Sequence, residues 1–364
     1  MKAKTFIVLL VVLCILAGTA YFMVQKDKLS GRQALLGKKL FETLTVGSID
    51  TIAVQSNEGD VTLKQGKDFW EVADRYHYRA DFSKVSDLVK KIEAVKIGRR
   101  FDSSDEILAR LSMHAPERGE IPKEQKGTRI VFKDKAGKEL ENFVIGSDAV
   151  RSDAFYIKRS NAPVIYLVDK EFKFLDKKPD QWLAKELVNV DEKDIALIAC
   201  YDMTTRKKIY MIERPEQAKD LVLLDAPPEK KLMKYKLEQV AGVLSPFKID
   251  DVVDPAKKPA DTGFSDKPQF EFRLFNGMIY HIYPGAKIKQ DSDKYYFKVA
   301  VSYSEPAAKT DADKKGTSED LSAKAKKLNS ELGDWTYIVS KWVYDSFATK
   351  MEDFFEKEKK DNKA

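Results

Sequence analysis

Short segments of the first half of the chain recur, in the same order, in the second half of the 364-residue sequence. Along the chain, residues 128–133 resemble 268–273, residues 143–146 resemble 282–285, residues 154–158 resemble 294–298, and residues 162–170 resemble 334–341. A glycine-containing turn follows the first of these segments in each half, at 135–138 and 275–277. The Asn-Gly of the second turn, set between alternating apolar and polar residues, indicates a β-hairpin. Because order and spacing hold throughout, we predict two copies of one unit.

Each predicted copy opens with a strand and continues with a helix. The opening strands are residues 49–54 and 193–198. In the first copy Asp81 is a favourable N-cap for a helix whose apolar residues share one face. These apolar residues are Phe82, Val85, Leu88, Val89, Ile92 and Val95 in the first copy, and Leu232, Leu237, Val240, Ala241 and Leu244 in the second.

Each copy also ends with apolar residues at helical spacing. In the first copy they are Phe172, Phe174, Leu175, Trp182, Leu183 and Leu187, and in the second Trp342, Val343, Phe347, Met351, Phe354 and Phe355. The predicted unit is therefore α+β: two strands, a helix, a run of antiparallel strands and a closing helix. We place the copies at residues 45–188 and 189–357, within the usual size range of a domain.

Two stretches interrupt the second copy. Residues 254–267 are rich in Pro, Lys and Asp and predict a loop, and about 305–320 are rich in Ala, Lys, Asp and Ser and predict a disordered insertion. Helical spacing resumes at Leu321, Ala325, Leu328 and Leu332. Residues 358–364 form a charged tail.

The N-terminal residues predict a membrane anchor. Lys2 and Lys4 precede an uncharged run at 5–24, and a helix over that run spans about 30 Å, the hydrocarbon thickness of a bilayer. The alternative is a cleaved signal peptide, because small residues at 18–20 suit a peptidase. The apolar residues continue to Val24, however, which favours an uncleaved signal anchor at 1–25 and a juxtamembrane linker at 26–44.

The orientation of that anchor depends on which signal dominates. Basic residues follow the apolar run at Lys26, Lys28, Arg32, Lys38 and Lys39, and the positive-inside rule by itself places the large domain in the cytoplasm. A short basic tip, an apolar run and a large following domain make up the layout of a signal anchor, which places the domain outside. We predict a single-pass protein of the bacterial inner membrane with its large domain in the periplasm.

Charge and cysteine content narrow the classes of function. The net charge is +6 and charged residues make up 34% of the chain, with both signs interspersed; a nucleic-acid binder more often concentrates basic residues on one face. We therefore predict no nucleic-acid partner. Of the two cysteines, Cys14 lies inside the apolar N-terminal run and Cys200 lies far away in the rest of the chain, so we predict no disulfide between them. Cys200 falls in an apolar strand, where we expect a small buried residue.

The most site-like local feature is an aromatic and basic cluster of five consecutive residues. It consists of Arg75, Tyr76, His77, Tyr78 and Arg79, which suit stacking on a flat ligand or holding an anion. The alternative is a loop between strand and helix whose aromatic side chains cover the edge of the core. Nearby Trp70 is predicted to be a core residue for the same reason.

No sequence motif predicts a catalytic, cofactor-binding or metal site. His77, His114 and His281 are far apart and lack Cys or carboxylate residues at ligand spacing. The glycines are scattered, so no phosphate-binding loop or nucleophile elbow is formed. We interpret Asp102, Asp105 and Glu106, and likewise Asp250 and Asp251, as residues of helix N-termini, where negative charge is favourable.

Part of the chain resembles the DUF4340 family, a bacterial domain of unknown function. The resemblance rests on Trp70-Glu71-Val72, on Ala80-Asp81 opening a helix, and on residues 144–146, 155–157 and 164–168. It covers most of residues 49–187 and, more weakly, the second copy. Residues 111–116 stand where the family typically has a Gly-Leu-x-x-Pro-like step, without the glycine, and Tyr210-Met211-Ile212 replaces the Trp-x-Val strand in the second copy.

The resemblance implies a membrane-anchored envelope protein with its domain outside, which is part of the reason for the orientation predicted above. It also implies an association with ABC-type export systems, including gliding-associated ones, and it supplies no catalytic residues. We predict a non-enzymatic accessory or scaffold protein with ABC transporter subunits as partners. The alternative is a periplasmic module that binds a cell-wall or lipid component in a cleft between the two copies. A third class, a hydrolase-type envelope enzyme, stays open because catalytic groups often meet only in three dimensions.

Overall fold

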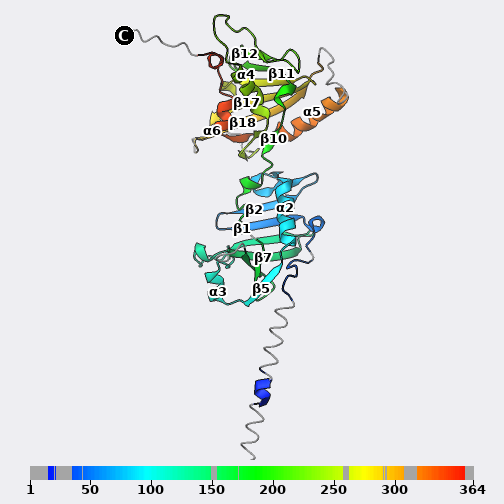
Figure 1. The fold of residues 1–364 in the computed structure, drawn as a ribbon, viewed down its shortest axis with the longest axis vertical. Coiled ribbons are helices and arrows are strands. Elements are labelled where there is room, and N and C mark those ends of the chain that lie inside the picture. The colour runs from blue at the N-terminus through cyan, green and yellow to red at the C-terminus, as the bar shows by residue number, and fades with distance from the viewer. Residues whose placement is uncertain are drawn as a thin grey trace, which may run out of the picture. The chain divides into compact units, whose positions relative to one another are not determined.

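The chain forms two compact units, residues 1–182 (unit 1) and 183–364 (unit 2), in a computed structural model. The structure describes residues 15–19, 21, 35–42, 44–148, 154–170, 172–256, 262–289, 291, 293–306 and 318–356. The fold is mixed α+β, with one large antiparallel sheet in each unit and few helices (Figure 1). The division between units falls after Trp182, whereas the internal repeat in the sequence predicted it after residue 188.

Unit 1 is built on a nine-stranded sheet of order β4-β3-β2-β1-β6-β7-β8-β9-β5. Its elements are η1 (Val46–Ser48), β1 (Thr51–Ser56), β2 (Gly59–Gln65), β3 (Trp70–Val72), η2 (Ala73–Arg75), β4 (Tyr78–Arg79), α2 (Phe82–Glu93), β5 (Ile97–Asp102), α3 (Asp105–Arg110), η3 (Lys123–Gln125), β6 (Thr128–Lys133), β7 (Glu139–Asp148), β8 (Phe155–Arg159), β9 (Val164–Val168) and η4 (Pro179–Trp182).

Local sequence explains the strands and the long helix of unit 1. Alternate residues of β1, such as Ile52 and Val54, are buried, as expected for a strand with one face in the core. The Asp81 side chain accepts hydrogen bonds from the backbone N–H groups of Ser83 and Lys84, so the predicted N-cap is confirmed. Val85, Leu88, Val89 and Ile92 of the predicted apolar face of α2 are buried, whereas Phe82, assigned to the same face, is 60% exposed because it is the first residue of the helix. Figure 1 shows this helix lying across the strands.

Unit 2 is built on an eight-stranded sheet of order β13-β12-β11-β16-β17-β18-β19-β15. Its elements are β10 (Glu186–Val188), η5 (Glu192–Asp194), β11 (Ile195–Tyr201), β12 (Lys208–Glu213), β13 (Val222–Leu223), α4 (Lys234–Ala241), η6 (Gly242–Leu244), β14 (Phe247–Lys248), β15 (Asp251–Val252), η7 (Phe264–Asp266), β16 (Gln269–Leu274), β17 (Met278–Lys287), β18 (Lys294–Tyr303), α5 (Ser318–Leu332), β19 (Tyr337–Ser340), α6 (Lys341–Ser346) and η9 (Met351–Phe354). A separate two-stranded ladder joins β10 to β14.

The hairpin and core predictions for unit 2 are confirmed. Gly277 adopts a left-handed φ of 89° in the turn between β16 and β17, a conformation that glycine enters without steric cost. Cys200 is buried in β11, and burial raises the pKa of its thiol to about 12. Helix α5 follows the predicted spacing, and the Asn329 side chain accepts a hydrogen bond from the backbone N–H of Val301 in β18.

The two sheets have the same strand order when they are compared position by position. Strands β3, β2, β1, β6, β7, β8, β9 and β5 of unit 1 occupy the places of β13, β12, β11, β16, β17, β18, β19 and β15 of unit 2. Strand β5, which precedes β6 in the chain, lies at the edge of the first sheet beyond β9. Strand β15, which precedes β16, lies at the corresponding edge of the second sheet beyond β19. Strand β4 extends the edge of the first sheet by one further strand.

The prediction that the first copy ends in a helix is wrong. Residues 172–178 form a turn, a bend and irregular backbone, and one turn of 3-10 helix follows at η4. Pro179 disfavours helical backbone at the residue before it, which prevents a continuous helix. The side chains that suggested the helix, such as Phe172, Leu175 and Trp182, are buried from an irregular segment instead. The Trp182 Nε1–H donates to the carbonyl of Asp176 at 3.0 Å.

The closing helix of the second copy is shorter than predicted. Helix α6 ends at Ser346, and a 3-10 turn, η9, follows at Met351. Phe347 and Phe354 are buried as expected, but Trp342 is 82% exposed and does not belong to the core. The apolar residues of this segment therefore do not share one face of one continuous helix.

The prediction that five acidic residues lie at helix N-termini is confirmed for two of them and wrong for three. Asp105 and Glu106 lie in the first turn of α3, which Ser104 caps, so their assignment is confirmed. Asp102 instead ends strand β5. Asp251 begins strand β15, and Asp250 forms an ion pair with Lys294, so the helix assignment of this pair is wrong.

Three predicted segments fall wholly or largely outside the described residues, and the charged tail predicted at 358–364 is wholly outside them. Of the predicted membrane-spanning run, residues 15–19 and 21 are described, and they are helical. Within the described part of the chain, no helix combines the length and apolar character needed to cross a membrane. Of the insertion predicted at about 305–320, residues 307–317 are not described, and residues 318–320 belong to α5 rather than to a disordered segment.

Candidate functional site

The predicted aromatic and basic cluster lies in the tight connection between β3 and β4. Tyr76 and His77 both adopt positive φ, 58° and 62°, an uncommon left-handed conformation for residues other than glycine. The turn returns the chain so that Tyr78 pairs with Val72 in the ladder. Tyr78 is consequently 2% exposed, whereas Tyr76 is 43% exposed.

The members of the cluster lie in different surroundings. The His77 Nδ1 lies 3.0 Å from the Glu71 Oε2, and both residues line a hollow of about 400 Å³. The remaining lining residues are Lys64, Gln65, Gly66, Lys67 and Lys135. Tyr78 belongs to the core, and Trp70 is buried as predicted.

Alanine substitutions within this cluster are expected to separate structural from surface residues. Tyr78→Ala should lower the free energy of unfolding by about 3 kcal/mol, because it leaves a cavity in the core. His77→Ala should change it by no more than about 0.5 kcal/mol, because the imidazole is a surface group. Chemical denaturation of the two variants checks this difference. Equal destabilisation by both substitutions would contradict the assignment of Tyr78 to the core.

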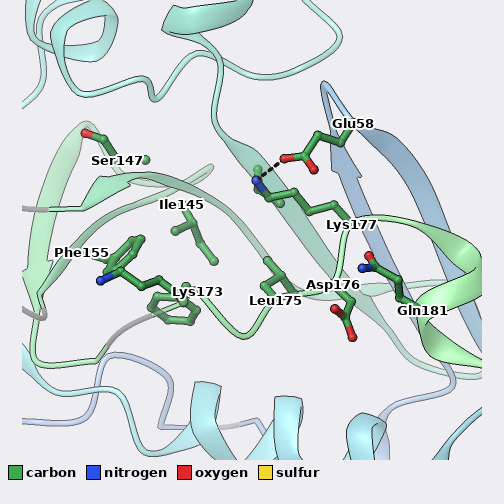
Figure 2. Close-up of a pocket in the computed structure, with 12 residues that line it drawn as sticks. Glu58, Ile145, Ser147, Phe155, Lys173, Leu175, Asp176, Lys177 and Gln181 are labelled. Atoms are coloured by element: carbon green, nitrogen blue, oxygen red, sulfur yellow. Dashed lines mark hydrogen bonds and ion pairs between the residues drawn. The ribbon is translucent and has the colours of Figure 1, made fainter.

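Unit 1 contains a larger cavity, of about 500 Å³, that sequence reasoning did not identify (Figure 2). It is lined by Glu58, Thr128, Ile145, Gly146, Ser147, Phe155, Phe172, Lys173, Leu175, Asp176, Lys177 and Gln181. We call it the unit 1 cavity. Its volume lies within the range of small-molecule sites, about 300–1,000 Å³.

Three neighbouring strands and one irregular segment build the unit 1 cavity. Thr128 at the start of β6 pairs with Ile145 of β7 in the ladder, and Phe155 at the start of β8 pairs with Asp148 of β7. Residues 172–181 supply the opposite wall, and the Phe172 and Phe155 rings meet edge to face at 5.8 Å.

Ion pairs hold that wall in place. The Lys177 Nζ lies 2.7 Å from the Glu58 Oε1, which joins the wall to the turn between β1 and β2 (Figure 2). Donation by Lys177 also lowers the pKa of Glu58. From α2, the Lys84 Nζ reaches the Asp176 Oδ2 and the Gln181 carbonyl oxygen, each at 2.7 Å. The cavity is therefore framed by fixed charged groups.

One signal in the sequence did point toward the unit 1 cavity. The segments that carry the resemblance to DUF4340 include Ile145, Gly146 and Phe155, which all line it. Gly146 packs tightly here: a Cβ at this position would lie 2.4 Å from the Leu111 carbonyl oxygen. The other lining residues come from distant parts of the chain and share no sequence motif.

Unit 2 contains a second cavity, of about 570 Å³. It is lined by Met203, Phe264, Ser265, Tyr283, Lys298, Ala300, Asn329, Gly333 and Asp334. Tyr283 and Lys298 are cross-strand partners on β17 and β18, and burial raises the pKa of Tyr283. The corresponding cross-strand pair of unit 1, Val144 and Lys158, lies outside the unit 1 cavity, so the two cavities occupy different places in their sheets.

Unit 2 also presents an exposed tryptophan. Trp342 lies on α6 and is 82% exposed. Lys341 and Asp345, its neighbours on this helix, form an ion pair one helical turn apart. An exposed tryptophan is notable because this residue type is enriched among those that dominate binding energy at protein interfaces.

The described residues hold no group of three or more His, Cys, Asp or Glu side chains arranged to bind a metal ion. His114 is buried beside Arg118, with the Arg118 guanidinium 3.0 Å from its Nδ1. His281 pairs with Ser302 on the neighbouring strand, and burial lowers the pKa of its imidazole. The three histidines thus lie in three separate surroundings.

Comparison with known proteins places the chain in a family. The sequence model of DUF4340, described as a domain of unknown function, matches residues 70–268, more than half of the chain. The match begins at β3 and ends before β16, so it covers most of the resemblance predicted over 49–187 and includes part of the second copy, where a weaker resemblance was predicted. Searches of curated proteins and of solved structures return no match. The chain therefore belongs to the DUF4340 family.

Proposed function

We propose that this chain is a non-enzymatic accessory or scaffold protein of the bacterial inner membrane, with both units in the periplasm, and that it associates with an ABC-type transport complex. The uncharged run at 5–24 supports the anchor, because its length matches the hydrocarbon thickness of a bilayer. The association with a transport complex rests on the resemblance to DUF4340, which implies that relatives accompany ABC-type export systems.

We also propose that the two units are tandem copies of one ancestral unit. The recurring sequence segments support this, and so does the identical order of corresponding strands in the two sheets. Strand β1, for example, lies between β2 and β6, and strand β11 lies between β12 and β16. Independent origins would not require the same order.

The placement of perturbed titratable groups favours a binding role over catalysis. Catalytic sites bring groups with shifted pKa values together in a cleft. Here the shifted groups that line cavities, Glu58 in unit 1 and Tyr283 in unit 2, line different cavities. Burial also raises the pKa of Cys200 and of Tyr210, which are enclosed by the sheet of unit 2 and do not line its cavity. Their shifts are explained by core packing.

The observation that carries the accessory function is the exposure of Trp342. Burying a Trp side chain removes a large apolar area from water, and tryptophan is enriched among the residues that dominate binding energy. In unit 2 the core aromatic residues, such as Phe347, are buried, whereas Trp342 on the adjacent helix is not. We infer that Trp342 anchors a subunit of the transport complex.

Trp342→Ala is expected to lower the recovery of a transporter permease or ATPase at least about tenfold, as expected for an interface hot spot. The measurement is crosslinking in intact cells, followed by membrane solubilisation, purification of the tagged full chain and quantitative mass spectrometry. The midpoint of thermal unfolding should stay unchanged, because the side chain makes few contacts within unit 2.

Tyr235→Ala provides the matched control for Trp342→Ala. Tyr235 is a 59% exposed aromatic residue of α4 in the same unit, and its removal should leave recovery of the transporter subunit unchanged. Equal recovery with the Trp342 variant and the unaltered chain would refute the anchoring role of Trp342. Recovery of no transporter subunit with the unaltered chain, across several detergents, would refute the proposed association itself.

A further inference from the structure

The unit 1 cavity combines an apolar floor with polar groups that lack partners. Ile145, Phe155, Phe172 and Leu175 supply the apolar surface, and the figure shows Lys173 extending beside Phe155 (Figure 2). Such a mixture of hydrophobic side chains and a few polar groups is typical of sites that bind organic ligands. These side chains are buried in the packing of β7, β8 and the wall segment.

Two polar side chains of the unit 1 cavity have no partner among the described residues. The Lys173 ammonium forms no ion pair or hydrogen bond there, and neither does the Thr128 hydroxyl. Thr128 is only 8% exposed. Lys173 is exposed to solvent and Thr128 lines the same cavity, so both groups are available to a ligand that enters it. Both groups act as donors toward an anionic oxygen.

The charges around the unit 1 cavity leave an excess of one positive charge. Glu58 is matched by Lys177, and Asp176 is matched by Lys84, each at 2.7 Å. Lys173 is the remaining charged residue of the lining. A ligand with one negative charge would therefore neutralise the site, whereas a cation would meet uncompensated repulsion.

We propose that the unit 1 cavity binds an amphiphilic monocarboxylate, such as a fatty acid or an aryl acid. Its carboxylate accepts hydrogen bonds from Lys173 and Thr128, and its apolar part packs on Phe155, Phe172 and Leu175. This site lies in unit 1, away from the residue that carries the proposed partner binding, so the inference does not depend on that function. The class of ligand follows from the unmatched donors, the single excess charge and the apolar floor.

The test compares three water-soluble probes that share one apolar body: phenylbutyrate, phenylbutanamide and phenylbutylamine. Titration of the full chain in nanodiscs, followed by saturation-transfer NMR and calorimetry, should show the carboxylate binding most tightly and the amine most weakly. Lys173→Met should weaken phenylbutyrate binding about tenfold, the effect of one charge-assisted hydrogen bond, and leave phenylbutanamide binding unchanged. Lys173→Arg should restore most of the affinity.

Lys178→Met is the matched control, because Lys178 is an exposed neighbour in the same segment that does not line the cavity. This substitution should not change phenylbutyrate binding. Thr128→Val keeps the side-chain shape and should weaken phenylbutyrate binding by a smaller factor. Equal affinity for carboxylate and amine, full affinity in the Lys173→Met variant, or absence of saturable binding would each overturn the proposal. None of these results would alter the recovery of a transporter subunit through Trp342.

Discussion

Replacing Phe347 with alanine is expected to lower the free energy of unfolding of unit 2 by about 3–5 kcal/mol, the usual cost of truncating a core phenylalanine. Phe347 is 4% exposed. Its ring meets those of Phe297, Phe270 and Phe247 at centroid distances of 5.0, 5.6 and 5.7 Å. Because one side chain joins β14, β16 and β18 at this point, its loss leaves a cavity that a rigid sheet cannot close.

Denaturant titration of the full chain, together with hydrogen exchange of peptides from β16 and β18, measures this effect. The loss of protection should be concentrated in unit 2. Phe82→Ala is the control, because Phe82 is 60% exposed on α2 and its removal should cost no more than about 0.5 kcal/mol. A cost below about 1 kcal/mol for Phe347→Ala would contradict the central role of this ring in the core.

Arg159→Met is expected to destabilise unit 1 by about 3 kcal/mol at neutral pH, because it leaves the Glu141 carboxylate buried without its partner. Glu141 is 6% exposed on β7. The Arg159 guanidinium on β8 donates to it at 3.0 Å. Loss of one partner from such a pair costs more than loss of both, so Arg159→Met combined with Glu141→Gln should recover much of the stability.

The destabilisation by Arg159→Met should depend on pH in a defined direction. Burial raises the pKa of Glu141 above 4.5, and Arg159 opposes that rise. Without Arg159 the folded-state pKa rises further, so the folded state binds the proton more tightly than the unfolded state. Stability then decreases as pH rises from about 4.5 through the folded-state pKa. The deficit of the variant should therefore shrink on acidification, and a deficit that is independent of pH would contradict this account.

The elements that sequence reasoning predicted correctly are those that local interactions specify. The strands of the 128–145 and 270–282 hairpins follow from period-two alternation and from glycine turns, and the N-cap of α2 follows from Asp81. The closing helix of the first copy was wrong because apolar spacing alone does not distinguish a helix from an irregular buried segment, and Pro179 decides between them.

The candidate sites were less predictable. In the cluster at 75–79, two consecutive left-handed residues break the alternation of inward and outward side chains. The sequence therefore could not show that Tyr78 is buried and Tyr76 exposed. The exposure of Trp342 was overlooked in the sequence, although its five-residue separation from Phe347 places the two side chains about 140° apart around a helix.

The sequence by itself determined the family, the α+β class and the order of most strands, because these depend on side-chain periodicity, turn residues and helix capping within a few residues along the chain. The tertiary structure decided which side chains meet. Lys173 and Thr128 lie far apart in sequence, and they line one cavity because β6, β7 and β8 pair side by side while residues 172–181 fold back against them. Whether a charged group finds a partner depends on such long-range contacts, and no local pattern encodes them.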